Sequence, residues 1–195
     1  MRAKGMGADV VVTEVEPVNA LRARMEGFKV MPMDDAAKIG ELFITTTGCS
    51  GIITEKHFGM MKNGAILSNS GHFNVEIDTV ALEKIAVSKK TMRKDNVEYI
   101  LQNGNKIYLL AEGRLVNLAA AEGHPSEVMD MSFANQFLSL LWLARNKGKI
   151  KPNVYAVAKE QDAEVAAIKL ATMGIKIDTL TEEQKKYLEG FDTGT

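Results

Sequence analysis

The chain has 195 residues, and its 24 Lys and Arg are nearly balanced by 25 Asp and Glu, which are interspersed rather than grouped. This balance excludes the strong positive field expected of a protein that binds nucleic acid or an anionic membrane. No apolar run approaches the roughly 20 residues of a membrane helix, and the N-terminus lacks a signal peptide's apolar centre, so we expect a soluble, cytoplasmic protein. The single Cys49 cannot form an intramolecular disulfide; we expect it to be packed, and we expect no metal site.

Strand-like and helix-like segments alternate over the first 90 residues. The predicted strands are rich in β-branched residues, and Pro, Gly or capping residues bound the predicted helices. We expect strands at 10–14, 28–31, 42–47 and 65–69, and helices at 17–26, 34–39 and 54–61. This alternation indicates an α/β fold, with a Rossmann-like parallel sheet and helices on both faces.

The pattern changes after Val75. Residues 77–85 are expected to be helical, and Asn103-Gly104 predicts a β-hairpin between 97–101 and 106–110. The longest predicted helix is 126–145, whose apolar residues follow helical spacing and are expected in a core or an interface. The remaining predictions are a short strand at 154–157, a helix at 162–173, a last helix opened by the capping box 181–184, and frayed residues at 191–195.

The N-terminal segment lacks the glycine-rich turn that opens a dinucleotide-binding βαβ unit. We interpret Gly5 and Gly7 as helix-end glycines, and we expect the chain to begin inside the first βαβ unit, as a truncated or split protein would. Glu14 nevertheless ends a predicted strand, where a carboxylate can accept both ribose hydroxyls of NAD and repel the 2′-phosphate of NADP. The alternative for Glu14 is a solvated side chain beside a helix cap.

Two segments place polar residues beside chain-bending Gly and Pro, as is typical where backbone approaches a ligand. One is 68–78, which contains Gly71-His72, and the other is 111–136, which contains Asn117 and His124. For both histidines the alternative is a buried ring that is hydrogen-bonded to backbone. Two further residues are expected to be structural: His57 at the surface of a short helix, and Arg114 as a brace of the hairpin.

Four segments, 14–20, 45–49, 70–78 and 111–136, together closely resemble the S-adenosylhomocysteine hydrolase (adenosylhomocysteinase) family, and the resemblance runs from Met1 to about Leu188. It implies a partial NAD-binding Rossmann domain over 1–124, truncated at its N-terminus. Residues 125–195 would then form a hinge, a long helix and a C-terminal oligomerisation arm. The implied reaction is the reversible hydrolysis of S-adenosyl-L-homocysteine to adenosine and L-homocysteine, through transient 3′-oxidation of the ribose by tightly held NAD.

Carried over position by position, the resemblance implies cofactor contacts at Glu14, Asn19, Thr46, Thr47, Ser70, Gly71, His72, Asn117 and His124. Glu14 would bind the ribose, and the segment that ends at His72 would pass the nicotinamide, with His72 as the candidate catalytic proton relay. Asn117 would face the carboxamide, because an Asn side chain supplies one donor and one acceptor. His124 would lie at the hinge.

The resemblance also implies what the chain lacks alone. The family's substrate domain and its glycine loop have no counterpart here, so we expect the chain alone to be inactive. We expect it either to form a homo-oligomer, which is a tetramer in the family, or to associate with a missing N-terminal half. Two alternatives stay open. One is an NAD-linked D-2-hydroxyacid dehydrogenase-like fragment, because residues 58–69 resemble that fold as well. The other is a non-catalytic remnant that oligomerises through the long helix 126–145 and the C-terminal arm. The choice between adenosine and a deaminated nucleoside is also open.

Overall fold

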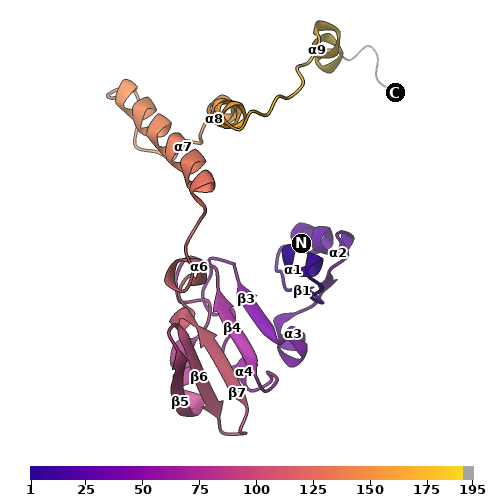
Figure 1. Cartoon of the computed structure of the whole chain (residues 1–195), viewed down its shortest axis with the longest axis vertical. Helices are drawn as coiled ribbons and strands as arrows, with labels where there is room; N and C mark the ends of the chain where they lie inside the picture. Colours follow the sequence, from indigo (N-terminus) through magenta and orange to yellow (C-terminus); the bar gives the residue numbers. More distant parts are fainter. Residues whose placement is uncertain (191–195) are drawn as a thin grey trace. The chain divides into compact units, whose positions relative to one another are not determined.

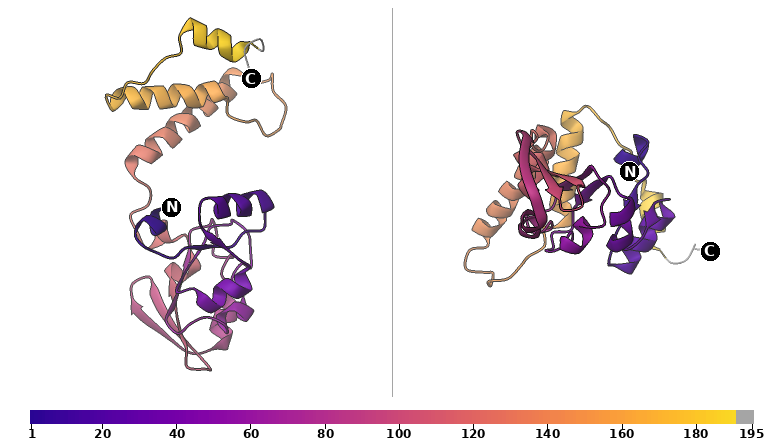
Figure 2. Two further views of the ribbon diagram at one scale, coloured as in Figure 1. Left: turned by 90° about the vertical axis from the view of Figure 1, so that its right-hand side faces the viewer. Right: turned by 90° about the horizontal axis from the view of Figure 1, so that it is seen from below.

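The structure, a computed structural model, describes residues 1–190. The chain divides into two compact units, Met1–Gly123 and His124–Thr195, and each is described by itself. Figures 1 and 2 show the elements of both units. The fraying predicted for residues 191–195 lies outside the described residues. Within 1–190, no helix is both long enough and apolar enough to cross a membrane.

The first unit opens with a small parallel sheet and three helices. These elements are α1 (Arg2–Gly5), β1 (Val11–Val12), α2 (Pro17–Met25), β2 (Lys29–Val30) and α3 (Met33–Ile39). They follow the predicted order, although both strands are shorter than predicted. Helix α2 begins at Pro17, whose ring presets a helical φ, and the Glu16 side chain caps it by accepting a hydrogen bond from the Asn19 amide at 2.9 Å.

A five-stranded sheet in the order β3-β4-β7-β6-β5 forms the rest of this unit (Figure 1). Its strands are β3 (Leu42–Thr45), β4 (Ala65–Asn69), β5 (Ala86–Arg93), β6 (Asn96–Leu101) and β7 (Lys106–Leu110). Strands β3, β4 and β7 are parallel, whereas β6 and β5 pair antiparallel with their neighbours. The α/β class with helices on both sides is confirmed. The sheet is mixed rather than parallel throughout, because the predicted hairpin β6–β7 is antiparallel and β5 adds a second antiparallel pair.

Strand β5 is not predicted from the sequence. It follows directly after α5 (Thr79–Ile85). The N-cap residue of α5 is Asp78, whose carboxylate accepts a hydrogen bond from the Ala81 amide at 2.9 Å. All residues of β5 after the first are exposed, so the strand shows no alternation of buried and exposed side chains. An edge strand of this kind lacks the hydrophobic period on which strand prediction depends.

The core lies between the sheet and the two helices α4 (Glu55–Phe58) and α5. Phe58 from α4 and Leu82 from α5 are fully buried, in one cluster with Leu67 of β4 and with Ile107 and Leu109 of β7. Burial of a side chain of this size contributes about 1.5–3 kcal/mol. Strands β4 and β7 are therefore held in the middle of the sheet, and their carboxyl ends are fixed in position.

His57 is buried, so the prediction that it lies at the surface is wrong. Its Nδ1 accepts a hydrogen bond from the Thr54 amide at 3.0 Å, and its Nε2 lies 3.2 Å from Oδ1 of Asp34 in α3. Because Nδ1 accepts from a backbone amide, the proton sits on Nε2 and is donated to the carboxylate. Lys56 also pairs with Asp34. The imidazole therefore ties α4 to α3 and is covered by that contact.

The second unit contains α7 (Ser126–Arg145), α8 (Lys159–Thr172) and α9 (Glu182–Glu189). All three helices were predicted, and the capping box of Thr181 with Gln184 is formed. The predicted strand at 154–157 is wrong: the segment pairs with no strand in the described chain, and Val154 is 94% exposed. No residue of α7 is buried. A core role for its apolar residues is therefore wrong in this unit, and an interface stays a prediction.

Candidate functional site

The carboxyl ends of β3, β4 and β7 meet at one edge of the sheet, and open α/β sheets bind ligands outside such an edge. Two contacts hold the segments that leave this edge together. The Ser70 amide donates to the Thr45 carbonyl at 2.8 Å, and a parallel bridge pairs Asn69 with Leu115, just before α6 (Val116–Ala119). The structure thus brings the predicted residues that follow β3 and β4 to one edge, together with Asn117 in α6.

Glu14 lies exposed two residues after β1. Its Oε1 accepts hydrogen bonds from the amides of Val15 at 2.7 Å and Glu16 at 3.1 Å. These bonds, with the Glu16 amide the larger influence, hold the pKa of Glu14 below its usual range. Oε2 makes no hydrogen bond within residues 1–190. Glu14 therefore presents an ionised, fixed carboxylate with one oxygen available, and the exposed Asn19 follows in the first turn of α2.

A groove of about 240 Å³ lies between β1 and β3. Its lining comes from β1, α3, β3 and the loop after β3, namely Val11, Val12, Thr13, Met33, Ala36, Leu42, Phe43, Ile44, Thr45, Thr46, Thr47, Ile52 and Ile53. In the described chain β1 pairs only with β2, and β3 only with β4. The facing edges of these two strands border the groove. Thr46 and Thr47 lie at the end of the groove next to the carboxyl end of β3.

The two threonines after β3 differ in what their hydroxyls already do. The Thr47 hydroxyl donates to Glu76 Oε2 at 2.8 Å and accepts from the Cys49 amide at 3.0 Å. The Thr46 side chain is exposed and makes no hydrogen bond among the described residues, so its hydroxyl is the one available to a ligand. Cys49 is exposed, so the prediction that it is packed is wrong: it lies in the turn after β3 and not in a strand.

Glu76 is a buried acid that the sequence did not single out. Its carboxylate accepts hydrogen bonds from the Thr47 amide at 2.9 Å, the Thr47 hydroxyl at 2.8 Å and the Gly48 amide at 2.7 Å. Burial on its own raises the pKa of Glu76, but these hydrogen bonds outweigh it and hold the pKa below its usual range. Glu76 is therefore a buried carboxylate that stays ionised beneath the loop after β3.

Asn69, at the end of β4, is fully buried with its amide group completely used. Its Oδ1 accepts from the Thr45 hydroxyl at 3.0 Å and the Gly71 amide at 2.7 Å. Its Nδ2 donates to the carbonyls of Phe73 at 2.8 Å and Gly113 at 2.9 Å. One side chain thus connects the ends of β3 and β4 with η1 (Ala111–Gly113), which follows β7. The segment from Ser70 to His72 leaves β4 along a fixed path.

His72 is exposed and lines a hollow of about 480 Å³ with Phe73, Asn74, Arg114, Leu115, Leu118 and Ala119. The rings of His72 and Phe73 meet edge to face, with 4.2 Å between their centroids. Arg114 donates from Nε to the Ala111 carbonyl at 3.2 Å and so braces η1, while it also borders the hollow beside His72. Asn117, in the adjacent helix α6, is partly buried. A polar rim and an apolar wall therefore face one hollow.

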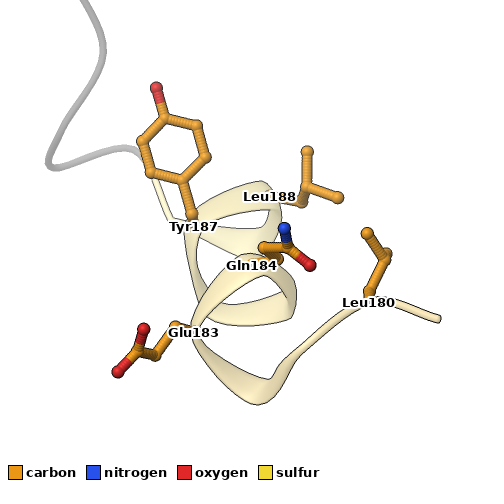
Figure 3. A pocket seen from close by; sticks show the side chains of 5 residues that line it. All are labelled: Leu180, Glu183, Gln184, Tyr187 and Leu188. Carbon is orange, nitrogen blue, oxygen red and sulfur yellow. The ribbon is translucent and has the colours of Figure 1, made fainter. Parts of the chain in front are cut away.

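His124 is the first residue of the second unit and is exposed. That unit also has a shallow hollow on the face of α9, lined by Leu180, Glu183, Gln184, Tyr187 and Leu188. Figure 3 shows Gln184 and Leu188, four residues apart, on one side of the helix, with Leu180 from the segment before the helix near them. One short helix and Leu180 before it form this surface, and no set of polar groups converges on it, so it lacks the features of a ligand site.

Comparison with known proteins decides the family. Residues 1–123 match the family described as "S-adenosyl-L-homocysteine hydrolase, NAD binding domain". The chain belongs to the adenosylhomocysteinase family. The resemblance carried by the four segments is thereby confirmed, and NAD is the cofactor of the matched domain. The dehydrogenase alternative receives no support from this match.

Curated relatives align with the whole chain. Adenosylhomocysteinase from Aquifex aeolicus is 59% identical over 194 residues, which cover 100% of this chain and 46% of that protein. S-inosyl-L-homocysteine hydrolase from Methanocaldococcus jannaschii is 58% identical over 195 residues, which cover 47% of that protein. The chain therefore spans about half the length of the curated relatives it matches. The solved structure of a D-lactate dehydrogenase from Treponema pallidum matches 42% of this chain and 24% of the dehydrogenase chain, at 27% sequence identity. The TM-score of this match is 0.34, which is too low to support any conclusion.

The described residues fit the NAD of this adenosylhomocysteinase domain by their chemistry. Glu14 offers the ionised acceptor that a ribose diol requires, and Thr46 offers an unused hydroxyl beside the groove. The hollow beside His72 has an apolar wall and a polar rim, as binding sites for flat aromatic rings commonly have. These three features lie after strands β1, β3 and β4.

Proposed function

We propose that this chain forms the NAD-binding part of an enzyme that reversibly hydrolyses S-adenosyl-L-homocysteine to adenosine and L-homocysteine. The observation that carries the proposal is the family match over residues 1–123, which contain eight of the nine implied cofactor residues. When bound, NAD would supply the reversible oxidation of the ribose 3′-hydroxyl on which this hydrolysis depends. The protein's own contribution would be to orient the cofactor and to move protons.

The adenosine end of NAD would be held after β1. Glu14 would accept hydrogen bonds from the ribose hydroxyls through its available Oε2, and Asn19 would contact the cofactor beside it. The negative charge of Glu14 would disfavour NADP, because a 2′-phosphate would meet an ionised carboxylate. Thr46 and Thr47 would line the cofactor after β3, with the Thr46 hydroxyl as the available donor.

The nicotinamide end would lie along the segment that follows β4. Ser70, Gly71 and His72 would pass the ring, and Asn117 would face its carboxamide. Exposure of the His72 imidazole at the hollow suits it to hold or move a proton near the ring. His124 would contribute from the hinge that joins the two units.

A complete site would include a further strand between β1 and β3. In the doubly wound order of a Rossmann sheet, one strand separates the pair formed by β1 and β2 from the strands β3, β4 and β7. The groove between β1 and β3, with a backbone edge on each side, supports the entry of such a strand. We therefore propose that the chain acts together with the part of its relatives that lies outside the matched half, which would also supply the substrate-handling residues.

Two further parts of the proposal concern assembly and location. The exposed apolar side chains Phe133, Phe137 and Leu140 on α7 support an oligomer interface on the second unit, because clustered apolar residues at a surface favour association. The metabolic nature of the named relatives and the near-neutral charge support a cytoplasmic location. The relatives act on an adenosyl or an inosyl substrate by their names, and either nucleoside fits the proposal.

A titration of the purified chain with NAD by calorimetry tests the cofactor site. We expect binding that weakens about tenfold or more in Glu14→Ala, because a hydrogen bond to a charged group typically contributes about 1.5–3 kcal/mol. Glu164→Ala, an exposed helical acid of the second unit, is the matched control and should bind as the parent does. Equal affinity of the parent and Glu14→Ala would overturn the assignment of Glu14.

The activity is tested by supplying the rest of the enzyme. The chain is co-expressed with the part of the Aquifex aeolicus relative that it does not match, and the complex is assayed for release of homocysteine from S-adenosyl-L-homocysteine. We expect NAD-dependent release by the complex and none by either polypeptide alone. A stable complex that is saturated with NAD and still inactive would contradict the proposed function.

A further inference from the structure

We propose that Glu76 is a positioning residue: its buried carboxylate holds the loop after β3 against the segment after β4, and so fixes the two stretches of backbone that face the cofactor. The part of this inference that concerns NAD rests on the proposed function, whereas the part that concerns the two loops is independent of it. Glu76 itself has no exposed surface, so its effect would pass through Thr47 and Gly71 and not through contact with a ligand.

The side chain of Glu76 is bound on one side by the loop after β3. Both carboxylate oxygens are used: Oε2 accepts from the amide and the hydroxyl of Thr47, and Oε1 accepts from the amide of Gly48. A carboxylate accepts hydrogen bonds and donates none, so all three donors point toward it. No Lys or Arg side chain within residues 1–190 pairs with it. Backbone amides and one hydroxyl therefore stabilise the negative charge, as in a backbone anion nest.

The main chain of Glu76 holds the far end of the same loop. Its carbonyl accepts hydrogen bonds from the amides of Ile52 at 2.8 Å and Ile53 at 2.9 Å, and Ile53 forms a parallel bridge with Ile77. The loop from Thr47 to Ile53 is therefore attached at both ends to one residue. Loss of the side-chain bonds would release only the end that begins at Thr47.

On its other side, Glu76 lies against the segment after β4. A Cβ placed on Gly71 would lie 1.6 Å from Glu76 Oε1 and 3.1 Å from Asn69 Oδ1, so the backbone of Gly71 touches both side chains. Asn69 binds the Gly71 amide, and Glu76 occupies the space beside its Cα. The carboxylate is thus enclosed between the backbone that carries Thr46 and Thr47 and the backbone that carries Ser70 and His72.

The decisive variant is Glu76→Gln, which keeps the size of the side chain and replaces one acceptor oxygen with a donor that faces an N–H group. Glu98→Gln is the matched control. Glu98 is also a buried, ionised acid of the same unit, but its carboxylate binds Tyr108 and Lys106 on strand β7. Both variants lose a buried carboxylate, so they separate loop positioning from general stability.

Two measurements are made under conditions in which each variant is folded. Amide hydrogen exchange of Thr47 and Gly48 should accelerate roughly tenfold or more in Glu76→Gln, the effect expected when a hydrogen bond to a charged acceptor is lost, and should stay unchanged in Glu98→Gln. The affinity for NAD should fall roughly tenfold in Glu76→Gln and stay unchanged in Glu98→Gln. If Glu76→Gln does not fold, Glu76→Asp, which keeps the charge and shortens the reach, replaces it and should show the same pattern more weakly.

The outcomes separate this inference from the proposed function. Unchanged exchange of Thr47 and Gly48 in the Glu76 variant overturns the inference, whether or not the chain binds NAD. Faster exchange with unaltered NAD affinity overturns the positioning role and leaves Glu76 a purely structural residue. If the parent chain itself binds no NAD, the proposed cofactor site fails, and the exchange measurement still decides whether Glu76 holds the loop.

Discussion

The Glu76 carboxylate occupies the space where a side chain on Gly71 would have to begin. A Cβ built at Gly71 would lie 1.6 Å from Oε1 and 2.6 Å from Cδ of Glu76, closer than any real contact. Glu76 cannot move aside freely, because three hydrogen bonds hold its carboxylate. Glycine is therefore required at position 71 by space alone.

Gly71→Ala should destabilise the first unit by about 1–3 kcal/mol, the range seen when a methyl group is forced into a well-packed site. Gly59→Ala is the control, because Gly59 has helical φ and ψ and the nearest atom to its added Cβ is the Lys56 carbonyl at 4.0 Å. That change should be neutral or stabilise by about 0.4–1 kcal/mol. Urea unfolding followed by far-UV circular dichroism measures both, and equal stabilities of the two variants would contradict the prediction.

Asn69→Asp should be destabilising at neutral pH and less so in acid. The new oxygen would face the carbonyls of Phe73 and Gly113, which now accept from Nδ2, so the loss should be about 2–4 kcal/mol at pH 8. Burial beside two carbonyls would raise the pKa of the introduced carboxyl above its unfolded value. The part of the penalty that comes from ionisation is then absent below the unfolded pKa, grows as pH rises from the unfolded to the folded pKa, and is complete above the folded pKa.

The measurement is the free energy of unfolding of Asn69→Asp relative to the parent at pH 5 and pH 8. Asn69→Leu, which cannot titrate, is the control and should show the same deficit at both pH values. A deficit of Asn69→Asp that does not shrink on acidification would show that the Nδ2 contacts do not determine its stability.

Glu76 should contribute stability that is lost in acid. Its pKa is held below the ordinary value of 4.5, so the contribution is present above pH 4.5 and disappears as pH falls through the folded pKa. Glu76→Gln should be less stable than the parent at pH 7 and should lose less stability than the parent between pH 5 and pH 3. Asp34 and Glu98 also have lowered pKa values, but they titrate in both proteins, so the difference between the two isolates Glu76. Parallel acid profiles would refute the prediction.

His57→Ala should cost about 0.5–2 kcal/mol for the lost cap of α4, and more because it leaves a void. His57→Gln should cost less, because a glutamine at the third position of a helix can accept from the Thr54 amide in the same way. Lys56→Ala removes an exposed partner of the same Asp34 and should cost at most about 1 kcal/mol. Thermal unfolding ranks the three variants, and a His57→Ala loss no greater than that of Lys56→Ala would contradict the buried role.

Local pattern was sufficient for the elements that carry their own signal. Strand β4, at 65–69, was predicted with its observed bounds, since it begins with a short apolar run, Ala65 to Leu67, directly after Gly64. Strand β5 carries no such signal, because its side chains are exposed on both faces of an edge strand. The same reasoning explains the segment 154–157, whose β-branched residues favour a strand but which has no neighbour to pair with in the described chain.

The candidate site was predictable where residues follow strand ends, and not where burial depends on distant contacts. Thr46 and His72 could be placed at the sheet edge because parallel strands share a direction. Glu76 could not, because it lies in an irregular segment and its carboxylate is bound by Thr47 and Gly48, nearly 30 residues away in the sequence. The predicted exposure of His57 was wrong for the same reason, because Asp34, which contacts its imidazole, lies in another helix.

Cys49 lies exposed in the turn that Glu76 holds, and its amide donates to the Thr47 hydroxyl at 3.0 Å. It is the only cysteine of the sequence. A thiol-reactive fluorophore would therefore attach at one known position, two residues from the threonine whose backbone the carboxylate fixes. Changes in its emission would report the arrival of a ligand at the sheet edge optically, without removal of competing cysteines or a chemical assay.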